Sequence, residues 1–406
     1  MHVHRLLPLL LALAAAGAPA ATPVPATSHA AAMAQAPSPA DFVIGKFKTH
    51  DLLIFDDAMH TAVEPWRFYI ELVKNPAFHS QVRHIFIEVL PVNFQPAVDA
   101  YLASPVDDPT ILYPALQAAS DLGWAYQTYI DLLRAVREVN QNLPADRKLR
   151  VIGTDQPSYW PLMTTTRDWE LSMVSGEARD FHMYAVTASR LGWFKEREKG
   201  ILLTNTRHSY KGIRNARGEL YWNAGTFFQQ HHPGKTYVVR IHHATLELKA
   251  RTAPAGTSTR EGLERAQVRW IRMEDGAWDC AHKATGYRPL GLELRGTPFG
   301  KAAYVGNHMM DVQAGTSMLD AYDGMLFLAP IDSMRSTARA DIYTPAFRKE
   351  LARRLRAMWS EEEIAAQLKS AGVPTLDAYV DNTFQPRPEQ REPVVAKLPP
   401  LVCGQD

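Results

Sequence analysis

Ionisable side chains follow five short apolar runs in this 406-residue chain, and they are residue types that transfer protons or bind ions. The first run, Leu-Leu-Ile-Phe at 52–55, is followed by Asp56, Asp57 and His60. The run at 84–89, "HIFIEV", carries Glu88 near its end. The other three runs end in Asp155, in Asn205, Arg207 and His208, and in His242 and His243.

The pairing of His60 with nearby carboxylates is typical of general base catalysis. A helix is expected to start close to His60, and the positive end of its dipole disfavours the imidazolium, so we expect a neutral base. Asp57 or Glu88 would fix the tautomer of His60 or hold a water molecule. Arg207, together with His208, would stabilise a developing oxyanion or bind a substrate carboxylate. We expect supporting roles for Asp56, Asp155, Asn205, His242 and His243.

The same residue types leave a metal site open as an alternative. A set of His60, Glu88, Asp155 and His208 would suit Mn²⁺, Zn²⁺ or Fe. Their spacing matches no compact zinc signature, so the fold would have to assemble such a site. A serine hydrolase is not indicated, because the sequence has no Gly-x-Ser-x-Gly motif, and it also lacks a phosphate loop and a dinucleotide-binding fingerprint.

Alternating strands and helices must position these side chains. Apolar runs predict strands, and three-to-four-residue spacing of apolar residues predicts helices between them. This order favours an α/β fold with a mostly parallel central sheet flanked by helices, in which functional residues collect beyond the carboxyl ends of the strands. The predicted strands are 51–55, 84–89, 149–153, 201–204, 237–241 and 325–328, and the predicted helices are 62–74, 113–140 and a segment within 166–199.

We expect one α/β domain over residues 41–383 with two insertions. Residues 156–200 read as a helical insertion, placed where a lid over the site would be. Residues 244–300 read as a hairpin insertion, with a turn at Asp275-Gly276. Two C-terminal helices are predicted from Thr344 onward, the second opened by a capping box at Ser360. The Pro-rich tail at 384–406 is expected to be disordered.

The first residues indicate export. Residues 1–20 combine Arg5, an apolar run and a small-residue site near Ala20, which is typical of a signal peptide, and 21–40 resemble a flexible linker. We therefore expect a periplasmic or secreted protein without a transmembrane segment. In an oxidising compartment Cys280 and Cys403 could pair and hold the tail.

The charge balance gives no case for nucleic acid as a partner. Without Arg5, 43 Lys and Arg residues face 43 Asp and Glu residues, and the signs are interspersed. A small-molecule substrate is the expected partner.

Over roughly residues 46–330, the layout resembles the superfamily of erythromycin esterases, haem-binding ChaN-type proteins and Tiki-type proteases. In that pattern a first strand runs into Gly-Glu-x-x-His, and here Asp56-Asp57-Ala58-Met59-His60 stands in its place. Glu88 matches the glutamate of the second strand, and "VIGTD" matches the strand that ends in Asp155. The stretch 204–208, "TNTRH", is similar to the esterases' His-Asn-x-His, and "MLDAYDGMLFLAP" at 318–330 resembles the closing strand.

This resemblance implies an exported hydrolase with His60 as the base for water attack on an ester, lactone or amide. The Tiki branch implies a metal on the His and Glu equivalents. The ChaN branch implies haem or iron binding, to which His231, His232, His308, Met309 and Met310 could contribute. A catalytically inactive relative is a further alternative, since Asp56 and Asp57 replace the Gly and Glu of the pattern.

Overall fold

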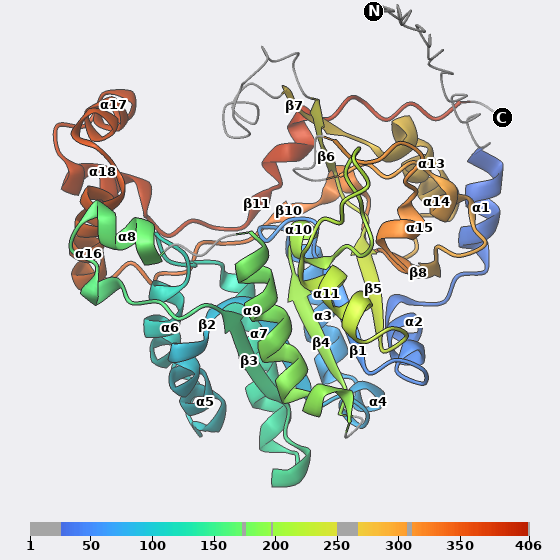
Figure 1. Ribbon diagram of the computed structural model, residues 1–406, viewed down its shortest axis with the longest axis horizontal. Helices are drawn as coiled ribbons and strands as arrows, with labels where there is room; N and C mark the ends of the chain where they lie inside the picture. The colour runs from blue at the N-terminus through green and yellow to red at the C-terminus, as the bar shows by residue number, and fades with distance from the viewer. Residues whose placement is uncertain (1–25, 173–175, 196–197, 250–266, 307–310, 405–406) are drawn as a thin grey trace, which may run out of the picture.

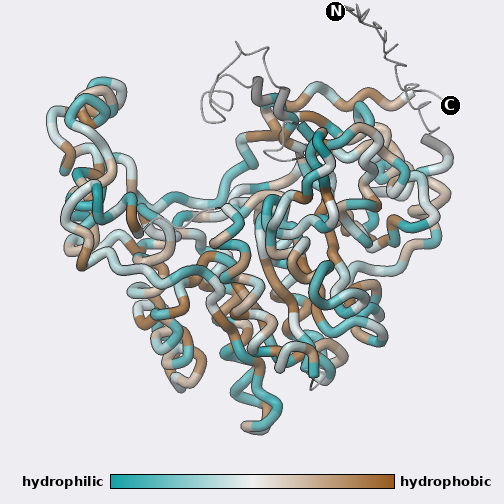
Figure 2. Tube along the Cα trace, viewed as in Figure 1, coloured by the Kyte–Doolittle hydropathy of each residue, from teal (hydrophilic) through white to brown (hydrophobic). Residues whose placement is uncertain are grey.

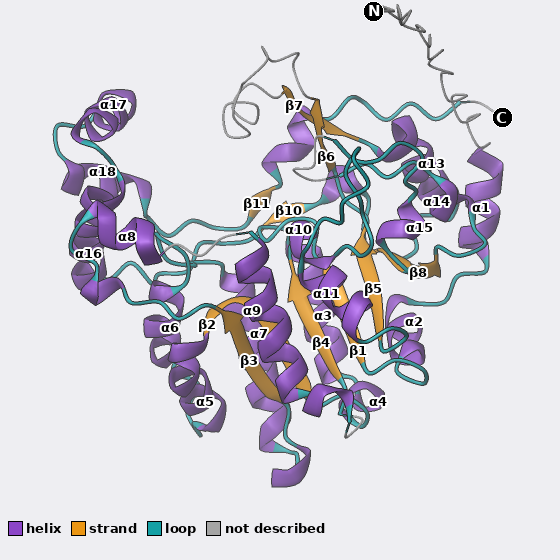
Figure 3. Ribbon diagram, in the orientation of Figure 1, coloured by secondary structure: helices purple, strands orange, loops and turns teal. Residues whose placement is uncertain are grey.

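The computed structural model describes residues 26–172, 176–195, 198–249, 267–306 and 311–404. At its centre is a seven-stranded sheet with the order β3-β2-β4-β1-β5-β9-β8 (Figures 1 and 3). Six strands run parallel, and β8 at one edge pairs antiparallel to β9. The strands are β1 Leu52–Asp56, β2 His84–Pro91, β3 Arg150–Asp155, β4 Gly200–Thr204, β5 Thr236–Ile241, β8 Leu290–Glu293 and β9 Gly324–Phe327.

The strands read as continuous apolar runs because helices cover both faces of the sheet. On one face Leu53 and Phe55 of β1 belong to a core cluster that includes buried residues of these described helices: α2 Pro39–Lys46, α3 Val63–Lys74, α4 Pro76–His79, α5 Gln95–Ala103, α6 Tyr113–Ala118, α7 Gln127–Gln141, α16 Pro345–Met358 and α18 Leu376–Thr383. On the other face Leu52 and Ile54 belong to a second cluster with α1 Ala26–Ala34, α9 Glu177–Arg190, α11 Ala224–His231, α13 Ala277–Ala284, α14 Pro298–Lys301 and α15 Met318–Ala321. Figure 2 shows the resulting pattern, with apolar residues concentrated in the strands and on the inner sides of the helices. The α/β class and all six predicted strands are confirmed.

The helix predicted over 113–140 is wrong as a single element. It divides into α6 and α7, and the break contains Ser120 and Gly123, both with positive φ. Helical periodicity continues across the break, but Gly123 adopts a left-handed conformation that ends regular helix. The break turns the chain so that α7 packs against α3.

The hairpin predicted around Asp275-Gly276 is also wrong in its strands. β7 Gln267–Ile271 pairs antiparallel with β6 Thr245–Lys249, so the two-stranded ribbon lies earlier in the chain. Residues 273–276 form a short 3₁₀ turn that leads directly into α13. An Asp-Gly pair favours a turn of either kind, and the packing of Trp278 in the core selects the helix.

Both ends of the predicted domain extend further than expected. The segment read as a linker contains α1, where His29 and Met33 are fully buried. The tail read as disordered contains β11 Gln390–Arg391, which pairs with β10 Arg335–Ser336, and it buries Val394 and Val395. The two C-terminal helices are confirmed as α16 and α17 Glu361–Ala371, with the capping box at Ser360.

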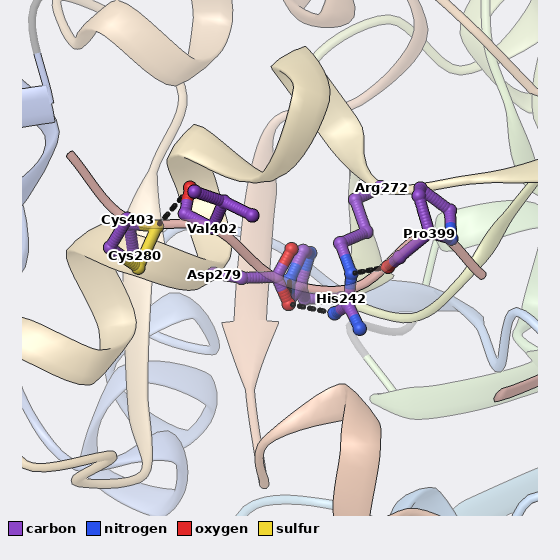
Figure 4. The surroundings of a disulfide bond; sticks show 7 residues. All are labelled: His242, Arg272, Asp279, Cys280, Pro399, Val402 and Cys403. Carbon is purple, nitrogen blue, oxygen red and sulfur yellow. Dashed lines mark hydrogen bonds and ion pairs between the residues drawn. A yellow bond between two sulfur atoms is a disulfide. The ribbon is translucent and has the colours of Figure 1, made fainter.

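A disulfide joins Cys280 of α13 to Cys403 in the tail, as the sequence allowed (Figure 4). The tail also approaches the core at Arg272, whose Nε donates to the carbonyl of Pro399 at 3.0 Å. Arg272 pairs in turn with Asp279, the residue before Cys280. The tail is therefore fixed to α13 by the disulfide and to Arg272 by a hydrogen bond.

No helix in the described part of the chain is long and apolar enough to span a membrane. The segment predicted to be a signal peptide, residues 1–20, lies outside the described residues.

Candidate active site

Side chains from the ends of β1, β2, β3 and β4 meet at one edge of the sheet, as predicted. Asp57 and His60 follow β1, and Asp155 ends β3. Glu88 lies within β2, at the point where its pairing with β4 has ended and its register with β3 shifts. Such an irregularity re-aims a side chain. His208 is carried by α10 Thr206–Ser209, directly after β4.

His60 lies between two carboxylates. Its Nδ1 is 2.8 Å from Asp57 Oδ2, and its Nε2 is 3.6 Å from Glu88 Oε2. The hydroxyl of Tyr129, on α7, lies 3.2 Å from Nδ1, and the ring of Trp124 packs against the imidazole edge. Because 17% of the His60 side chain is exposed while only 1% of Asp57 is, the ring can meet a ligand and its partner cannot.

Glu88 is held by three groups from other elements. Its Oε2 accepts the backbone N–H of Asn205 at 2.7 Å. Its Oε1 lies 3.2 Å from Arg179 and 3.2 Å from His208 Nε2. These contacts fix the carboxylate next to His60.

Two further pairs secure that arrangement. Arg179, on α9, binds Asp155 through two parallel hydrogen bonds of 2.8 and 3.0 Å. His208 Nδ1 lies 2.8 Å from Asp180 Oδ1, which also accepts the backbone N–H of Ala224 at 2.8 Å. Bidentate arginine–carboxylate geometry is strong and directional, so α9 binds the ends of β2, β3 and β4 together.

The carboxylates set the protonation of the site. Burial opposes the imidazolium of His60, but Asp57 and Glu88 outweigh it and raise the pKa of His60 to about 10. Burial likewise opposes a charged His208, and Glu88 with Asp180 raises the pKa of His208 to about 9. Burial raises the pKa of Asp57 despite the attraction of His60. Burial also disfavours ionised Glu88, yet His208 and His60 lower the pKa of Glu88 well below its usual range. These contacts favour a protonated His60 in the free protein, whereas the helix dipole alone favours a neutral one.

Asp56 has a structural position. Its Oδ1 accepts the backbone N–H of Ala58 at 2.8 Å and the hydroxyl of Thr206 at 2.7 Å, and its Oδ2 accepts the hydroxyl of Tyr322 at 2.7 Å. Ala58 has a φ of 58°, a left-handed conformation that costs a non-glycine residue energy. Asp56 thus holds the strained turn that presents Asp57 and His60.

A pocket of about 240 Å³ opens beside His60. Asn205 and Thr206 line it next to the imidazole, and Arg240 of β5 lines it from the neighbouring strand. The ribbon of β6 and β7 forms its remaining wall through Thr245, Leu246 and Trp270. The predicted hairpin insertion therefore contributes to the site.

Three predicted residues do not join this cluster. Arg207 is exposed and forms no side-chain hydrogen bond or ion pair with another described residue. His242 is buried 3.5 Å from Asp279, near the disulfide (Figure 4). His243 is buried against the carbonyl of Ala244. All three residues follow strands. A position after a strand is therefore not sufficient, because the side chain must also point toward the cluster.

The histidines proposed for haem lie elsewhere. His231 and His232 pack among Tyr184, Trp193 and Phe227 at the end of α11. That end leads into β5 at its amino-terminal edge, opposite the cluster. Residues 307–310, which include His308, Met309 and Met310, lie outside the described residues.

The sequence did not point to Arg179, Asp180, Tyr129 or Arg240. The two α9 residues stand in a polar stretch, "EARDFH", with no pattern that marks them. Arg240 did carry a signal, because a cation interrupts an otherwise apolar strand, "YVVRIHH".

A metal ion does not fit the described cluster. Among the described residues, no group of three or more His, Cys, Asp and Glu side chains is arranged to hold one. The guanidinium of Arg179 already lies between Glu88, Asp155 and His208, so it fills the position where a cation would bind these ligands.

Comparisons with known proteins give a likeness of fold. No protein-family model and no curated protein matches the sequence. A solved structure of a succinoglycan biosynthesis protein aligns with 74% of this chain and 95% of its own, at 11% identity and a TM-score of 0.51. An erythromycin esterase, EreC, aligns over 70% of this chain and 92% of its own, at 12% identity and a TM-score of 0.45. ChaN of Campylobacter jejuni, described with cofacially bound haem, covers 57% of this chain and 91% of its own, at 12% identity and a TM-score of 0.32.

The alignment with the succinoglycan biosynthesis protein shows a shared fold. An erythromycin esterase and a ChaN protein, two of the groups named by the sequence resemblance, are among the structural matches. At these identities the likeness does not extend to the activity of any of these proteins.

Proposed function

We propose that this protein is an exported hydrolase in which His60 activates water to attack an ester, lactone or amide. The observation that carries the proposal is the position of His60. Its Nδ1 is bound to buried Asp57, its Nε2 is next to Glu88, and the ring lines the pocket. A histidine oriented by a carboxylate on one nitrogen, with the other near a ligand space, has the geometry of a general base.

The reaction follows from that geometry. Neutral His60 takes a proton from water at Nε2 while the water oxygen bonds to the substrate carbonyl carbon. The resulting imidazolium is stabilised by Asp57 and Glu88. It then returns the proton to the leaving alcohol or amine as the carbon–heteroatom bond breaks, so one water is consumed and His60 is regenerated. The side-chain amide of Asn205, which lines the pocket, is available as a donor to the carbonyl oxygen.

Arg179 and His208 act as positioning residues in this proposal. They neutralise Glu88 and keep it beside His60 without lining the pocket. The transition-state role expected for Arg207 therefore passes to pocket residues. The disulfide supports the exported location, because such bonds persist in oxidising compartments.

The test is a hydrolysis screen of ester, lactone and amide libraries with the full chain, comparing wild-type protein with His60→Gln. His79→Gln is the matched control, because His79 lies on α4 at the opposite edge of the sheet. We expect turnover by the wild type and the control, and a loss of about 10²–10⁴-fold in His60→Gln, the usual contribution of general base catalysis. A folded His60→Gln that hydrolyses at the wild-type rate would disprove the role of His60.

The same screen tests the metal alternative. Each reaction is run with EDTA and with added Mn²⁺, Zn²⁺ or Fe²⁺, and the purified protein is analysed for metal and for a haem Soret band. The proposal predicts activity that survives EDTA. Activity that requires a stoichiometric metal would replace this mechanism with a metal-dependent one.

A further inference from the structure

Arg240 is a buried cation that lines the pocket beside His60. Only 4% of the residue is exposed, although it stands near the end of β5, which lies between β1 and β9 in the sheet. Its Nη1 donates to the carbonyl of Val305 at 3.2 Å, and its Nη2 donates to the hydroxyl of Thr245 at 3.0 Å. The hydroxyl of Tyr322 is a third hydrogen-bond partner. A guanidinium carries five N–H donors, so these bonds leave donors available.

No described carboxylate pairs directly with Arg240. Asp56 attracts it from a distance, but the oxygens of Asp56 accept hydrogen bonds from Ala58, Thr206 and Tyr322. The ring of Tyr322 lies under the guanidinium, 5.4 Å from its centre. A buried guanidinium is usually paired with an anion, so the lack of a carboxylate partner among the described residues is informative.

The ionisable side chains that line the pocket are both cationic. Of the residues that line it, His60 and Arg240 are the ionisable ones, and no carboxylate is among them. Burial opposes both charges, but neighbouring groups raise the pKa of His60 and that of Arg240, so both are cationic at neutral pH. Asp57 and Glu88 contact His60 without lining the pocket. A ligand therefore meets two positive groups.

The rest of the lining is mostly apolar and includes an aromatic ring. Met59, Ala244, Leu246 and Trp270 contribute to it, together with Thr61 and Thr245. The volume of about 240 Å³ corresponds to about eight water molecules. The pocket is thus suited to a small ligand with an anionic end and an apolar body.

We propose that Arg240 binds a carboxylate of the substrate, so that the enzyme acts on small esters or amides that also carry a free carboxylate group. This inference rests on the proposed function and specifies its substrate class. The two donor edges of the guanidinium match the two oxygens of a carboxylate, and the reacting carbonyl then lies on the His60 side of the pocket.

The first test measures binding without turnover, by isothermal titration calorimetry at low ionic strength. The probes are phenylacetate and its neutral analogue phenylacetamide. We expect phenylacetate to bind wild-type protein at least tenfold more tightly, and we expect Arg240→Gln to lose this preference. Arg269→Gln is the matched control, because exposed Arg269 lies on the β6–β7 ribbon beside the pocket and pairs with Glu247 without lining the pocket. Equal binding of the two probes to wild type, or no binding of either, would overturn the proposal.

Two additional variants guard against misfolding of Arg240→Gln. Arg240→Lys keeps the charge without the two-pronged donor set, and Thr245→Val removes the hydroxyl that orients Arg240. Both should retain the preference for phenylacetate at a reduced level. A full preference in a folded Arg240→Gln, as judged by circular dichroism, would contradict the assignment.

The second test separates this inference from the hydrolase proposal. It compares kcat/KM for monoethyl adipate, which has a free carboxylate, with that for diethyl adipate. We expect the monoester to be preferred by wild type and the preference to disappear in Arg240→Gln. Hydrolysis of both esters at equal rates would overturn the inference and leave the hydrolase intact. Selective binding of phenylacetate without hydrolysis of any ester would support the anion site and overturn the hydrolase.

Discussion

His60 is the residue on which the proposed chemistry depends, and its surroundings suit a general base. Asp57 Oδ2 lies 2.8 Å from His60 Nδ1, and the Asp57 side chain is nearly fully buried. The imidazole is therefore its main partner. The pair resembles the histidine–carboxylate unit of acyl-transfer enzymes, in which the carboxylate fixes the tautomer and stabilises the imidazolium. Glu88 adds a second negative charge on the other side of the ring. His60 is therefore a strong base that is mostly protonated at neutral pH.

Replacing Asp57 by Asn should separate orientation from charge. The amide retains the shape of the side chain but no longer stabilises the imidazolium and can hold the wrong tautomer. We expect kcat/KM to fall by about 10²–10⁴-fold, by analogy with other histidine–carboxylate pairs. We also expect the pKa of His60 to fall, because one of the two carboxylates that raise it is removed. NMR titration of the imidazole measures the second effect, and an unchanged pKa would contradict the assigned pairing.

At the scale of elements, α9 binds the strand ends together. Arg179 contacts Glu88 from β2, Asp155 from β3 and His208 from α10. The sequence predicted that β1 to β4 would deliver polar residues to one edge, because strand ends follow from apolar runs. It did not predict Arg179 or Asp180. In a polar helix the spacing of the residues does not show which polar side chains face the protein interior. Arg207, for which the sequence predicted a role in the site, is exposed and has no side-chain hydrogen bond or ion pair with the described residues of the cluster.

Arg179 and Arg207 form a matched pair for testing this element. Arg179→Gln leaves Glu88 and Asp155 without their cation. We expect the free energy of unfolding to fall by about 2–3 kcal/mol. This is less than for a fully buried pair, because 22% of the Arg179 side chain is exposed. Arg207→Gln should change it by less than about 0.5 kcal/mol, as for other exposed sites. Urea denaturation of both variants measures the difference. Equal stability of the two would show that α9 does not hold the site.

The layer around α13 should be sensitive to acid. Burial lowers the pKa of His243 to about 4, whereas the unfolded chain titrates near 6.5. The folded state therefore keeps His243 neutral while the unfolded state binds a proton, so stability is complete above pH 6.5 and falls as the pH decreases toward 4. The loss amounts to about 3 kcal/mol by pH 4. Burial likewise lowers the pKa of His282 to about 4.

Thermal unfolding of wild type and His243→Gln between pH 7 and 4 measures this effect. The variant should show a shallower loss of stability across that range. An identical pH dependence in the two proteins would mean that His243 does not titrate as described.

At the scale of the whole molecule, helix α1 and the C-terminal tail complete the layer of helices around α13. α1 packs against α13, and the tail is bound to α13 by the disulfide. Composition alone suggested flexible segments here, since Ala- and Pro-rich stretches are typical of linkers. The packing depends on a few residues, among them Met33, Val394 and Val395, whose partners are far away in the sequence. Such contacts leave no local pattern.

Removing the disulfide should release the tail. Cys280 and Cys403 are 123 residues apart in the sequence, and closing a loop of that order restricts the unfolded chain substantially. We expect a Cys280→Ser, Cys403→Ser double variant to lose about 2–4 kcal/mol of stability. Denaturation with and without reductant measures this loss, and wild type in reductant should behave like the variant. No change in either case would show that the tail does not contribute to stability.

The most direct test of the account is the pH dependence of kcat/KM for wild type and His60→Gln on the best substrate of the screen. If neutral His60 is the base and its pKa is about 10, the wild-type value should rise about tenfold per pH unit from pH 7 and level off near pH 10. His60→Gln should be far less active and should lack this rise. A wild-type profile that is flat or falls over this range, or a folded His60→Gln with wild-type activity, would contradict the central claim.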